Sequence, residues 1–437
     1  MDSMAALPKD PLIEIFSRVD NIKDLFMFAV TCRWWLHRFT DPAFLHELCR
    51  GKAEDHHVHL LGFFFHETTF KRCKRRFKCG KRQNSLVSVP TFFPTPGSPL
   101  GPTGRSLTSF FATVANGTFT YAEPLVARHG IILMNLIPRT FRGAHHSFKD
   151  MNKPLLVGLC NPISGEHHVL PPLEFSANVY FSSFAIITAA DNNNEGQRGN
   201  MFSQLLVISR CPRSDAVYLH SYSTSTCFWS APTKCLDKHR LSMLGGRSAV
   251  IHQGMAHWLC VDYGSRKRRA QDNDLYKLSV EVGTTRISLT KLPIRDGGLP
   301  VLCVNRDNKL FVACIYLGHV TIWTQQEDGE EEGNEGTPTP WLHTVIRIPA
   351  AVLDPNYRPL WQGGARWYHF NKGSLLVVYD NNSVFVLDLE EKVMEKVKDC
   401  LLPQSDNQGR VFVPYQMGLV DFFGSRRPAF LLDDLEA

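Results

Sequence analysis

The chain has 437 residues, of which 43% are hydrophobic and 11% aromatic, and its formal net charge is +6. This length and apolar content allow two or more packed domains and exclude a generally disordered chain. No apolar run approaches the roughly 18 residues of a membrane span, and the N-terminus lacks the apolar core of a secretory signal, so we expect a soluble protein of the cytoplasm, the nucleus or both.

The 12 cysteines are spread from Cys32 to Cys400 without a CxxC pair. Most of them lie inside apolar runs such as "LLVGLC" and "HWLCVD". Buried, reduced thiols fit this distribution better than a disulfide framework does. The cysteine pattern therefore agrees with an intracellular compartment.

Helix signals are concentrated in residues 1–50. Asp10 followed by Pro11 predicts a helix start. Apolar residues then recur at helical spacing: Leu12, Ile15, Phe16 and Val19. A second helix is expected from Asn21, with the apolar stripe Leu25, Phe28, Cys32 and Trp35. Asp41-Pro42 ends that helix and can start a third short one, so we expect a compact all-α module.

Residues 51–107 are expected to form a connector. They contain a basic run at 71–82, "KRCKRRFKCGKR", and then the proline-rich "VPTFFPTPGSPLGPTG". Proline at that density forbids continuous helix or interior strand. The basic run suits a nuclear-import signal, a phosphate-binding strip or a solvated linker, and a nucleic-acid partner is not favoured. The apolar "LLGFFF" (60–65) is an exception that could dock onto a neighbouring domain.

From residue 108 to residue 437 the chain consists of short apolar or alternating runs separated by Gly, Pro, Asn and Asp. Such runs predict β-hairpins and meanders. A strand pattern that recurs at spacings of about 40–60 residues is typical of propeller blades. We therefore expect a large all-β domain, a β-propeller, whose blade number the degenerate repeat leaves open. Three long polar segments are candidates for target-binding loops: 191–200, 263–274 and 325–340.

The N-terminal module must bind something outside itself. A segment of about 45 residues cannot bury enough surface to be stable alone without a metal, a disulfide or a partner. The run "LFMFAV" (25–30) makes its helix hydrophobic on every side. Trp34 and Trp35 also point about 100° apart on a helix, so one face cannot bury both. Spacing alone does not say which face meets the partner.

The stretch "LPKDPLIEIFSRVDNIKDLFMFAVTCRWWLHRFTDPAFL" resembles an F-box, the helical motif through which substrate receptors attach to the SKP-type adaptor of SCF ubiquitin ligases. Trp34 stands at the variable position before the family's tryptophan, which is Trp35 here. Thr31 departs from the family's usual Val-Cys pair. The resemblance implies an adaptor-binding set of Leu7, Pro8, Leu12, Ile15, Leu25, Phe28, Val30, Cys32, Arg33 and Trp35.

Shorter stretches, among them "CNPISGEHHVLPP" and "GHVTIW", are similar to blade strands of the F-box-associated propeller regions of large plant families. The two resemblances together imply a substrate-recognition subunit of an SCF-type ubiquitin ligase. It would bind the SKP-type adaptor, and cullin through that adaptor, and capture an unidentified target protein with its β-domain. No catalytic residue, cofactor or membrane is implied.

The alternative is a propeller enzyme or small-molecule sensor whose helical segment serves to dimerise or target it. The sequence contains no Gly-x-Ser-x-Gly elbow, HExxH motif or Walker loop. The histidine clusters at 56–59, 145–146 and 167–168 do not predict a metal site, because adjacent histidines on a strand point to opposite faces. His257 is expected to be a structural histidine of a blade. We therefore favour a non-catalytic adaptor subunit without a metal or cofactor.

Overall fold

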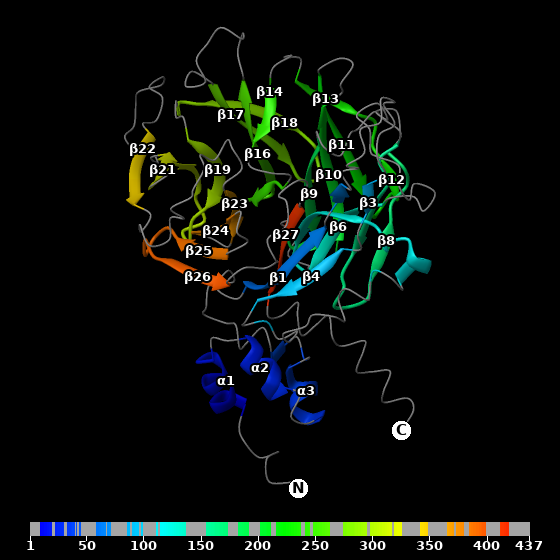
Figure 1. Cartoon of the computed structure of the whole chain (residues 1–437), viewed down its shortest axis with the longest axis vertical. Coiled ribbons are helices and arrows are strands. Elements are labelled where there is room, and N and C mark those ends of the chain that lie inside the picture. The colour runs from blue at the N-terminus through cyan, green and yellow to red at the C-terminus, as the bar shows by residue number, and fades with distance from the viewer. Residues whose placement is uncertain are drawn as a thin grey trace, which may run out of the picture. The chain divides into compact units, whose positions relative to one another are not determined.

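The structure is a computed structural model of the whole chain (Figure 1). The residues that it describes are 9–19, 22–29, 33–39, 41, 43–44, 58–66, 68–70, 85–87, 90–95, 98, 111, 114–136, 154–173, 182–191, 202–210, 216–236, 241–244, 248–262, 274–294, 298–316, 319–325, 341–347, 365–370, 373–379, 384–398 and 411–418.

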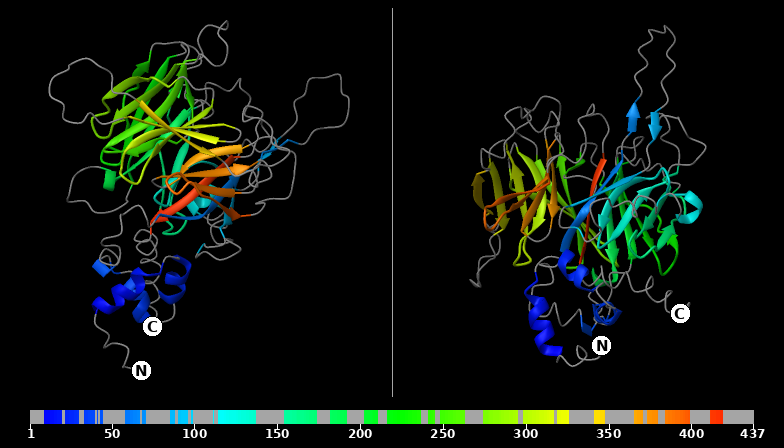
Figure 2. Two further views of the ribbon diagram at one scale, coloured as in Figure 1. Left: turned by 90° about the vertical axis from the view of Figure 1, so that its left-hand side faces the viewer. Right: turned by 60° about the horizontal axis from the view of Figure 1, so that its bottom comes forward.

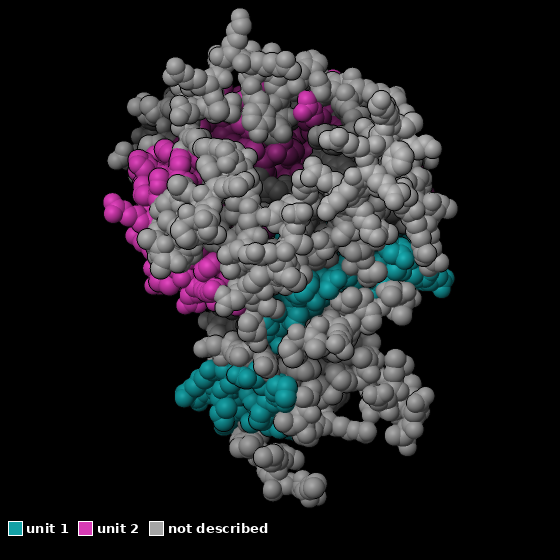
Figure 3. Space-filling model, in the orientation of Figure 1, with its two compact units in different colours: residues 1–150, 156–172, 407–437 teal, residues 151–155, 173–406 magenta. Residues whose placement is uncertain are grey.

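Six antiparallel sheets of three to five strands are the blades of a β-propeller (Figure 2). The propeller predicted from the sequence is confirmed, and the blade number that the sequence left open is six. The chain divides into two compact units, which Figure 3 distinguishes by colour. Unit 1 comprises residues 1–150, 156–172 and 407–437, and unit 2 comprises residues 151–155 and 173–406.

Unit 1 contains two of the six sheets. The first sheet has the order β27-β1-β4, and its strands are β1 (Val58–His66), β4 (Thr91–Pro94) and β27 (Val411–Gly418). The second sheet consists of β5 (Glu123–Arg128), β6 (Ile131–Asn135), β7 (Val157–Cys160) and β8 (His167–Val169). A separate pair of short strands is formed by β2 (Thr68–Phe70) and β3 (Ser85–Val87). Two 3-10 turns are η3 (Val114–Gly117) in this unit and η6 (Ala189–Asp191) in unit 2.

The first sheet joins distant parts of the chain. β1 pairs with β27 from Val58↔Gly418 to His66↔Val411 and also pairs with β4. The buried Tyr415 hydroxyl donates a 3.0 Å hydrogen bond to the Gly130 carbonyl, which links β27 to the β5–β6 turn. The stretch "LLGFFF" is therefore the middle of a blade strand. The expected connector 51–107 thus contains strands, and a boundary at 108 cuts this sheet apart.

Three short helices also belong to unit 1: α1 (Lys9–Ser17), α2 (Ile22–Ala29) and α3 (Arg33–Phe39). The expected helix from Asn21 to Asp41 is described as two elements rather than one. Buried apolar side chains of these helices and of β1, β4 and β27 form one hydrophobic cluster, which includes Leu12, Trp35, Phe39, Phe64, Phe92 and Tyr415. Among the described residues, no helix is both long and apolar enough to cross a membrane.

Unit 2 contains the remaining four sheets. The first is built from β9 (Ser182–Thr188), β10 (Phe202–Arg210), β11 (Val217–Ser223), β12 (Phe228–Trp229) and β13 (Thr233–Leu236). The next is built from β14 (Leu241–Leu244), β15 (Val250–His252), β16 (Met255–Asp262), β17 (Asp274–Glu281) and β18 (Ile287–Leu292). The last two are β19 (Leu299–Val304), β20 (Leu310–Ile315), β21 (His319–Gln325) and β22 (Trp341–Arg347), followed by β23 (Ala365–Phe370), β24 (Ser374–Tyr379), β25 (Val384–Asp388) and β26 (Met394–Lys398).

Tight hairpins connect some of these strands because the sequence supplies residues that tolerate positive φ. His129 and Gly130 have φ values of 49° and 75° in the β5–β6 turn, and Gln253 and Gly254 have φ values of 48° and 71° in the β15–β16 turn. Two-residue hairpin loops of type I′ need positive φ at both central positions. A Cβ on Gly130 would meet only the flexible end of the Met417 side chain, so the positive φ of the turn is what favours glycine here.

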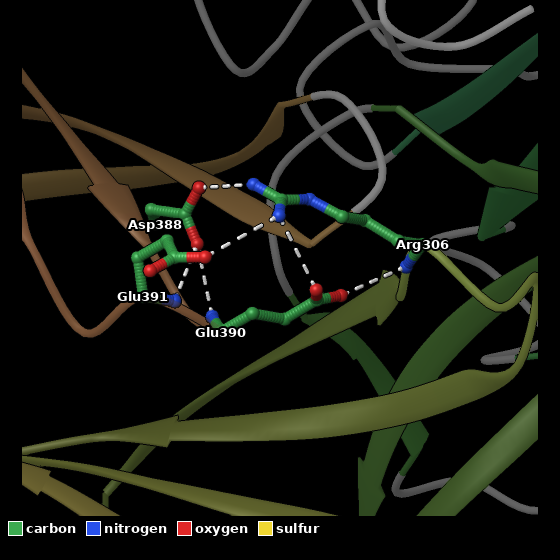
Figure 4. Close-up of polar contacts among 4 residues, drawn as sticks. All are labelled: Arg306, Asp388, Glu390 and Glu391. Carbon is green, nitrogen blue, oxygen red and sulfur yellow. Dashed lines mark hydrogen bonds and ion pairs between the residues drawn. The ribbon is translucent and has the colours of Figure 1, made fainter. Parts of the chain in front are cut away.

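An ion-pair cluster connects the last two sheets of unit 2 (Figure 4). The Arg306 guanidinium, in the β19–β20 turn, contacts the Asp388 carboxylate and lies 3.4 Å from a Glu390 carboxylate oxygen. The Arg306 backbone N–H donates to Glu390 at 3.2 Å. Asp388 in turn accepts the backbone N–H groups of Glu390 and Glu391, each at 2.9 Å. Asp388 therefore caps its own turn and pairs with the neighbouring sheet at once.

Candidate functional site

The helical segment has a buried aromatic centre. Trp35 lies at its middle, with ring-centroid distances of 5.2 Å to Phe16 and 4.7 Å to Phe28. Phe39 lies 5.0 Å from Phe16 and 5.5 Å from Phe44. Most of these rings meet at steep angles, which is the favoured arrangement for aromatic pairs. Packing on Trp35 thus joins side chains from α1, α2 and α3.

Four large apolar side chains of the same segment remain exposed. Ile15 is 56% exposed, Met27 55%, Trp34 40% and Phe28 37%. They come from all three helices, and we call them the exposed apolar set. Phe28 contacts both Phe16 and Trp35, and the Trp34 ring lies 4.5 Å from the Trp35 ring. The set therefore rests on the buried aromatic centre.

Helical periodicity explains the division between buried and exposed residues in α1. Leu12 and Phe16 are four positions apart and both are buried, whereas Ile15 lies about 100° from Phe16 around the helix and is exposed. In α2, Leu25 is buried and Met27 and Phe28 are exposed. The apolar end of α2 thus presents apolar side chains to solvent as well as to the core.

Polar groups flank this segment. Asp24 is exposed in the first turn of α2. Asp41 accepts the Ala43 backbone N–H at 2.9 Å, as a capping side chain does. The Arg38 guanidinium lies 5.5 Å from the centre of the Phe44 ring, in cation–π range. The helical segment therefore carries charges of both signs.

The structure separates the ten residues predicted to bind the adaptor into three groups. Leu12, Leu25 and Trp35 are buried, whereas Ile15 and Phe28 are exposed. Arg33 begins α3, but its side chain is not described. The other four, Leu7, Pro8, Val30 and Cys32, lie outside the described residues.

Sequence reasoning did not assign Met27 and Trp34 to the surface. Their exposure of 55% and 40% places them in the exposed apolar set. A signal for both residues was present, because the six-residue apolar run includes Met27 and two adjacent tryptophans cannot share one helix face. For the two adjacent tryptophans, only the packing in the structure shows which ring is buried and which is exposed.

The blades contain buried serine–histidine pairs. His257 Nδ1 lies 2.8 Å from the Ser279 hydroxyl, and His220 Nε2 lies 3.0 Å from the Ser209 hydroxyl. Burial lowers the pKa of His220 to about 4 and, with smaller contributions from the charges of Lys277 and His252, the pKa of His257 to about 3. Such neutral, enclosed histidines are satisfied core groups rather than general bases for an external substrate.

Among the described residues, the cysteine and histidine positions give no further chemical site. Burial raises the pKa of the Cys160 and Cys303 thiols far above the usual value, so both stay protonated. Cys227 is the exposed one among the described free thiols. His167 and His168 lie side by side on the exposed strand β8, and the described part of the chain contains no group of three or more potential metal ligands.

The three candidate target-binding loops lie almost entirely outside the described residues. Residues 192–200, 263–273 and 326–340 lie outside the described residues, as does the basic run 71–82. The described ends of these segments are strands or short turns of unit 2, for example η6 before the first loop and β22 after the third.

Comparison with known proteins returns no family for this chain. No family model matches it, and no curated protein matches it. The F-box resemblance therefore rests on the residues quoted above alone.

Several solved structures are similar to the chain at low identity. TolB from Acinetobacter baumannii is 7% identical, with a TM-score of 0.38 over 84% of this chain and 69% of its own length. A chain of a nidogen/laminin complex is 9% identical, with a TM-score of 0.35 over 77% of this chain and 92% of its own. A prolyl endopeptidase structure is 12% identical, with a TM-score of 0.33 over 64% of this chain and only 36% of its own length. These likenesses add no activity or ligand.

Proposed function

We propose that this chain is a substrate-recognition subunit of an SCF-type ubiquitin ligase. The helical segment binds an SKP-type adaptor, and through it cullin, while the β-propeller captures a target protein. The chain itself is non-catalytic, needs no cofactor and works in the cytoplasm, the nucleus or both.

The observation that carries this proposal is the exposed apolar set on a small helical segment. Fully burying a side chain such as Ile, Phe or Met stabilises by about 1.5–3 kcal/mol, so covering the part-exposed set of Ile15, Met27, Phe28 and Trp34 would contribute on the order of 4 kcal/mol. Apolar side chains gathered in this way typically mark an interaction site. A partner with an apolar groove is the chemistry that they fit.

The sequence resemblance supports the identity of that partner. The Leu7-Pro8 pair, Leu12, the Asp24-Leu25 pair and the Cys32-Arg33-x-Trp35 string follow the F-box pattern in the right order. In the structure Leu12, Leu25 and Trp35 are buried, and the Trp35 ring contacts the exposed Phe28 and Trp34. Some residues of the F-box pattern hold the helices together, and apolar residues next to them face solvent. This combination suits a module that docks onto a partner.

The role of the β-propeller follows from its architecture. Its blades are rigid scaffolds with buried cores, and loops carried by such scaffolds commonly bind partners. The segments 191–200, 263–274 and 325–340 are our candidates for those loops. The second is basic and the third acidic, so either could attract a target of opposite charge.

Size-exclusion chromatography of the full chain with a purified SKP-type adaptor tests the proposal. We expect the two proteins to co-elute, and cullin to join the complex only when the adaptor is present. An adaptor that elutes separately from a folded full-length chain contradicts the proposal. A complex that forms between the chain and cullin without the adaptor contradicts it as well.

A further inference from the structure

Strand β22 is the outermost strand of its sheet, as seen at the left of Figure 1. It pairs with β21 along its whole seven-residue length, from His319↔Arg347 to Gln325↔Trp341, without a register shift. In the described part of the chain, nothing pairs with its other edge. Its outer backbone N–H and C=O groups therefore offer a regular ladder to an additional strand.

Other outer strands of the described sheets carry features that discourage strand addition. β8 has only three residues. β26 carries charged side chains, and its pairing with β25 contains a register shift. β18 contains Lys291, which forms a 2.8 Å ion pair with Asp274. Short length, irregularities and charged side chains are the common means of protecting a sheet edge. β22 has none of these, since its one charged residue is the terminal Arg347.

Apolar side chains are exposed along β22. Leu342 is 54% exposed and Val345 is 50% exposed. They lie on opposite faces of the strand because their positions differ by an odd number. Apolar side chains thus flank the open backbone edge on both faces.

We propose that β22 pairs with β22 of a second copy of this chain, antiparallel and around a two-fold axis at Thr344. This register uses all seven residues and gives the cross-strand pairs Trp341 with Arg347, Leu342 with Ile346, His343 with Val345, and Thr344 with itself. Leu342 then meets the apolar Ile346, Val345 lies opposite His343, and Thr–Thr is a favourable cross-strand pair.

Charge favours the antiparallel arrangement over an in-register parallel one. An in-register parallel pairing would set Arg347 against Arg347, whereas the antiparallel one sets it against the Trp341 ring, a good cation–π partner. No cross-strand pair of the antiparallel arrangement joins like charges.

The size of the contact predicts its strength. Seven residues of strand span about 23 Å, which alone forms an interface below the standard size of about 1,600 Å². We therefore expect a weak, concentration-dependent dimer with a dissociation constant on the order of 10 µM. Dimer formation through unit 2 is independent of adaptor binding, so failure of one proposal leaves the other standing.

Charged substitutions at the two-fold axis test the proposal sharply. Thr344 is exposed, so Thr344→Lys and Thr344→Glu should leave the blade folded, but each places like charges face to face in the dimer. The matched control is Thr290→Lys, an exposed threonine in the middle of the outer strand β18. Sedimentation velocity on the full chain from about 1 to about 100 µM brackets the expected dissociation constant.

The expected result has two parts. The parent chain and Thr290→Lys dimerise, and each Thr344 variant alone dimerises at least about tenfold more weakly. An equimolar mixture of Thr344→Lys and Thr344→Glu restores the dimer, because opposite charges then meet at the axis. A misfolded variant could not produce that recovery. A parent chain that stays monomeric, or Thr344 variants that dimerise like the parent, would overturn the proposal, as would a mixture that gains nothing.

Discussion

Trp34 and Trp35 are neighbours in the sequence, and their rings lie 4.5 Å apart and nearly perpendicular, yet Trp35 is 5% exposed and Trp34 is 40% exposed. One tryptophan holds the three helices together and the other lies on their surface. This arrangement explains how adjacent residues of one type can have different roles. It also places an aromatic ring, a side chain enriched among binding hot spots, on the outside of a buried aromatic centre.

Substitution of the two tryptophans should separate these roles. We expect Trp35→Ala to destabilise the helical segment by about 3–5 kcal/mol, the usual effect of truncating a buried tryptophan. Trp34→Ala should lower stability by about 1 kcal/mol or less, the value of one aromatic pair, while weakening adaptor binding. Amide hydrogen exchange of residues 9–39 measures the first effect, and adaptor affinity measures the second. An equal loss of hydrogen-exchange protection in Trp35→Ala and Trp34→Ala would contradict the assignment of Trp35 to the core and Trp34 to the surface.

The stability of a propeller fragment should depend on whether it begins at residue 51 or at residue 108, which the sequence does not indicate. A fragment 108–437 lacks β1 and β4, so it leaves β27 without its partner, whereas a fragment 51–437 retains the whole first sheet. We expect the longer fragment to be soluble and to unfold at a higher temperature. Circular dichroism melting of the two fragments is the check. A shorter fragment as stable as the longer one would show that the β1–β27 pairing is dispensable.

Acid should destabilise the blades through His220 and His257. Their pKa values in the folded chain are about 4 and about 3, below the ordinary 6.5, because burial disfavours the charged imidazolium. The unfolded chain therefore binds more protons between these values, and stability is lost as the pH falls below 6.5. His220 alone should account for about 3 kcal/mol between pH 8 and pH 4.

Urea unfolding across this pH range measures the effect. The variant His220→Gln cannot titrate there, so it should show a shallower fall in stability with decreasing pH than the parent does. An unchanged slope would mean that His220 is not buried in the neutral form.

In the Arg306 ion-pair cluster, replacing Asp388 should lower the free energy of unfolding more than replacing Arg306. Arg306→Met removes a part-exposed ion pair and should cost about 1 kcal/mol or less. Asp388→Ala also removes the acceptor for two backbone N–H groups, so we expect a loss of about 1–3 kcal/mol. Lys291→Met, which breaks the exposed pair with Asp274, is the matched control and should change the urea midpoint least. A larger loss of stability for Arg306→Met than for Asp388→Ala would contradict the capping role of Asp388.

Local patterns predicted the β-rich region because alternating and apolar runs determine strands. The same patterns could not count the blades, since the repeat is degenerate. They also could not predict that β1 pairs with β27, because the Val58↔Gly418 register joins residues from distant parts of the chain rather than nearby ones. From its sequence, the apolar stretch 60–65 was predicted only to dock onto a neighbouring domain.

For the candidate site, periodicity placed Leu12, Ile15 and Phe16 on one apolar stripe, but of these three only Leu12 and Phe16 are buried. Periodicity gave no answer at all in "LFMFAV". Every residue of that run is apolar, so hydrophobicity carries no information about direction. Burial of Leu25 and exposure of Met27 follow from packing in the helical segment, which involves residues from all three helices. Such a distinction needs tertiary structure.

The central claim is that the exposed apolar set binds an SKP-type adaptor. Its most direct test is a calorimetric titration of the purified adaptor into the full chain, repeated with the double variant Ile15→Asp/Met27→Asp. Both side chains are more than half exposed, so the double variant should stay folded. The control is Phe228→Asp, which removes a 73% exposed aromatic side chain from unit 2.

We expect saturable binding for the parent chain and for Phe228→Asp, and a loss of at least about 100-fold, or roughly 2.7 kcal/mol, for the double variant. Folding of each protein is checked by its circular dichroism spectrum. Absence of adaptor binding by the folded parent chain, or undiminished binding by the double variant, would contradict the account.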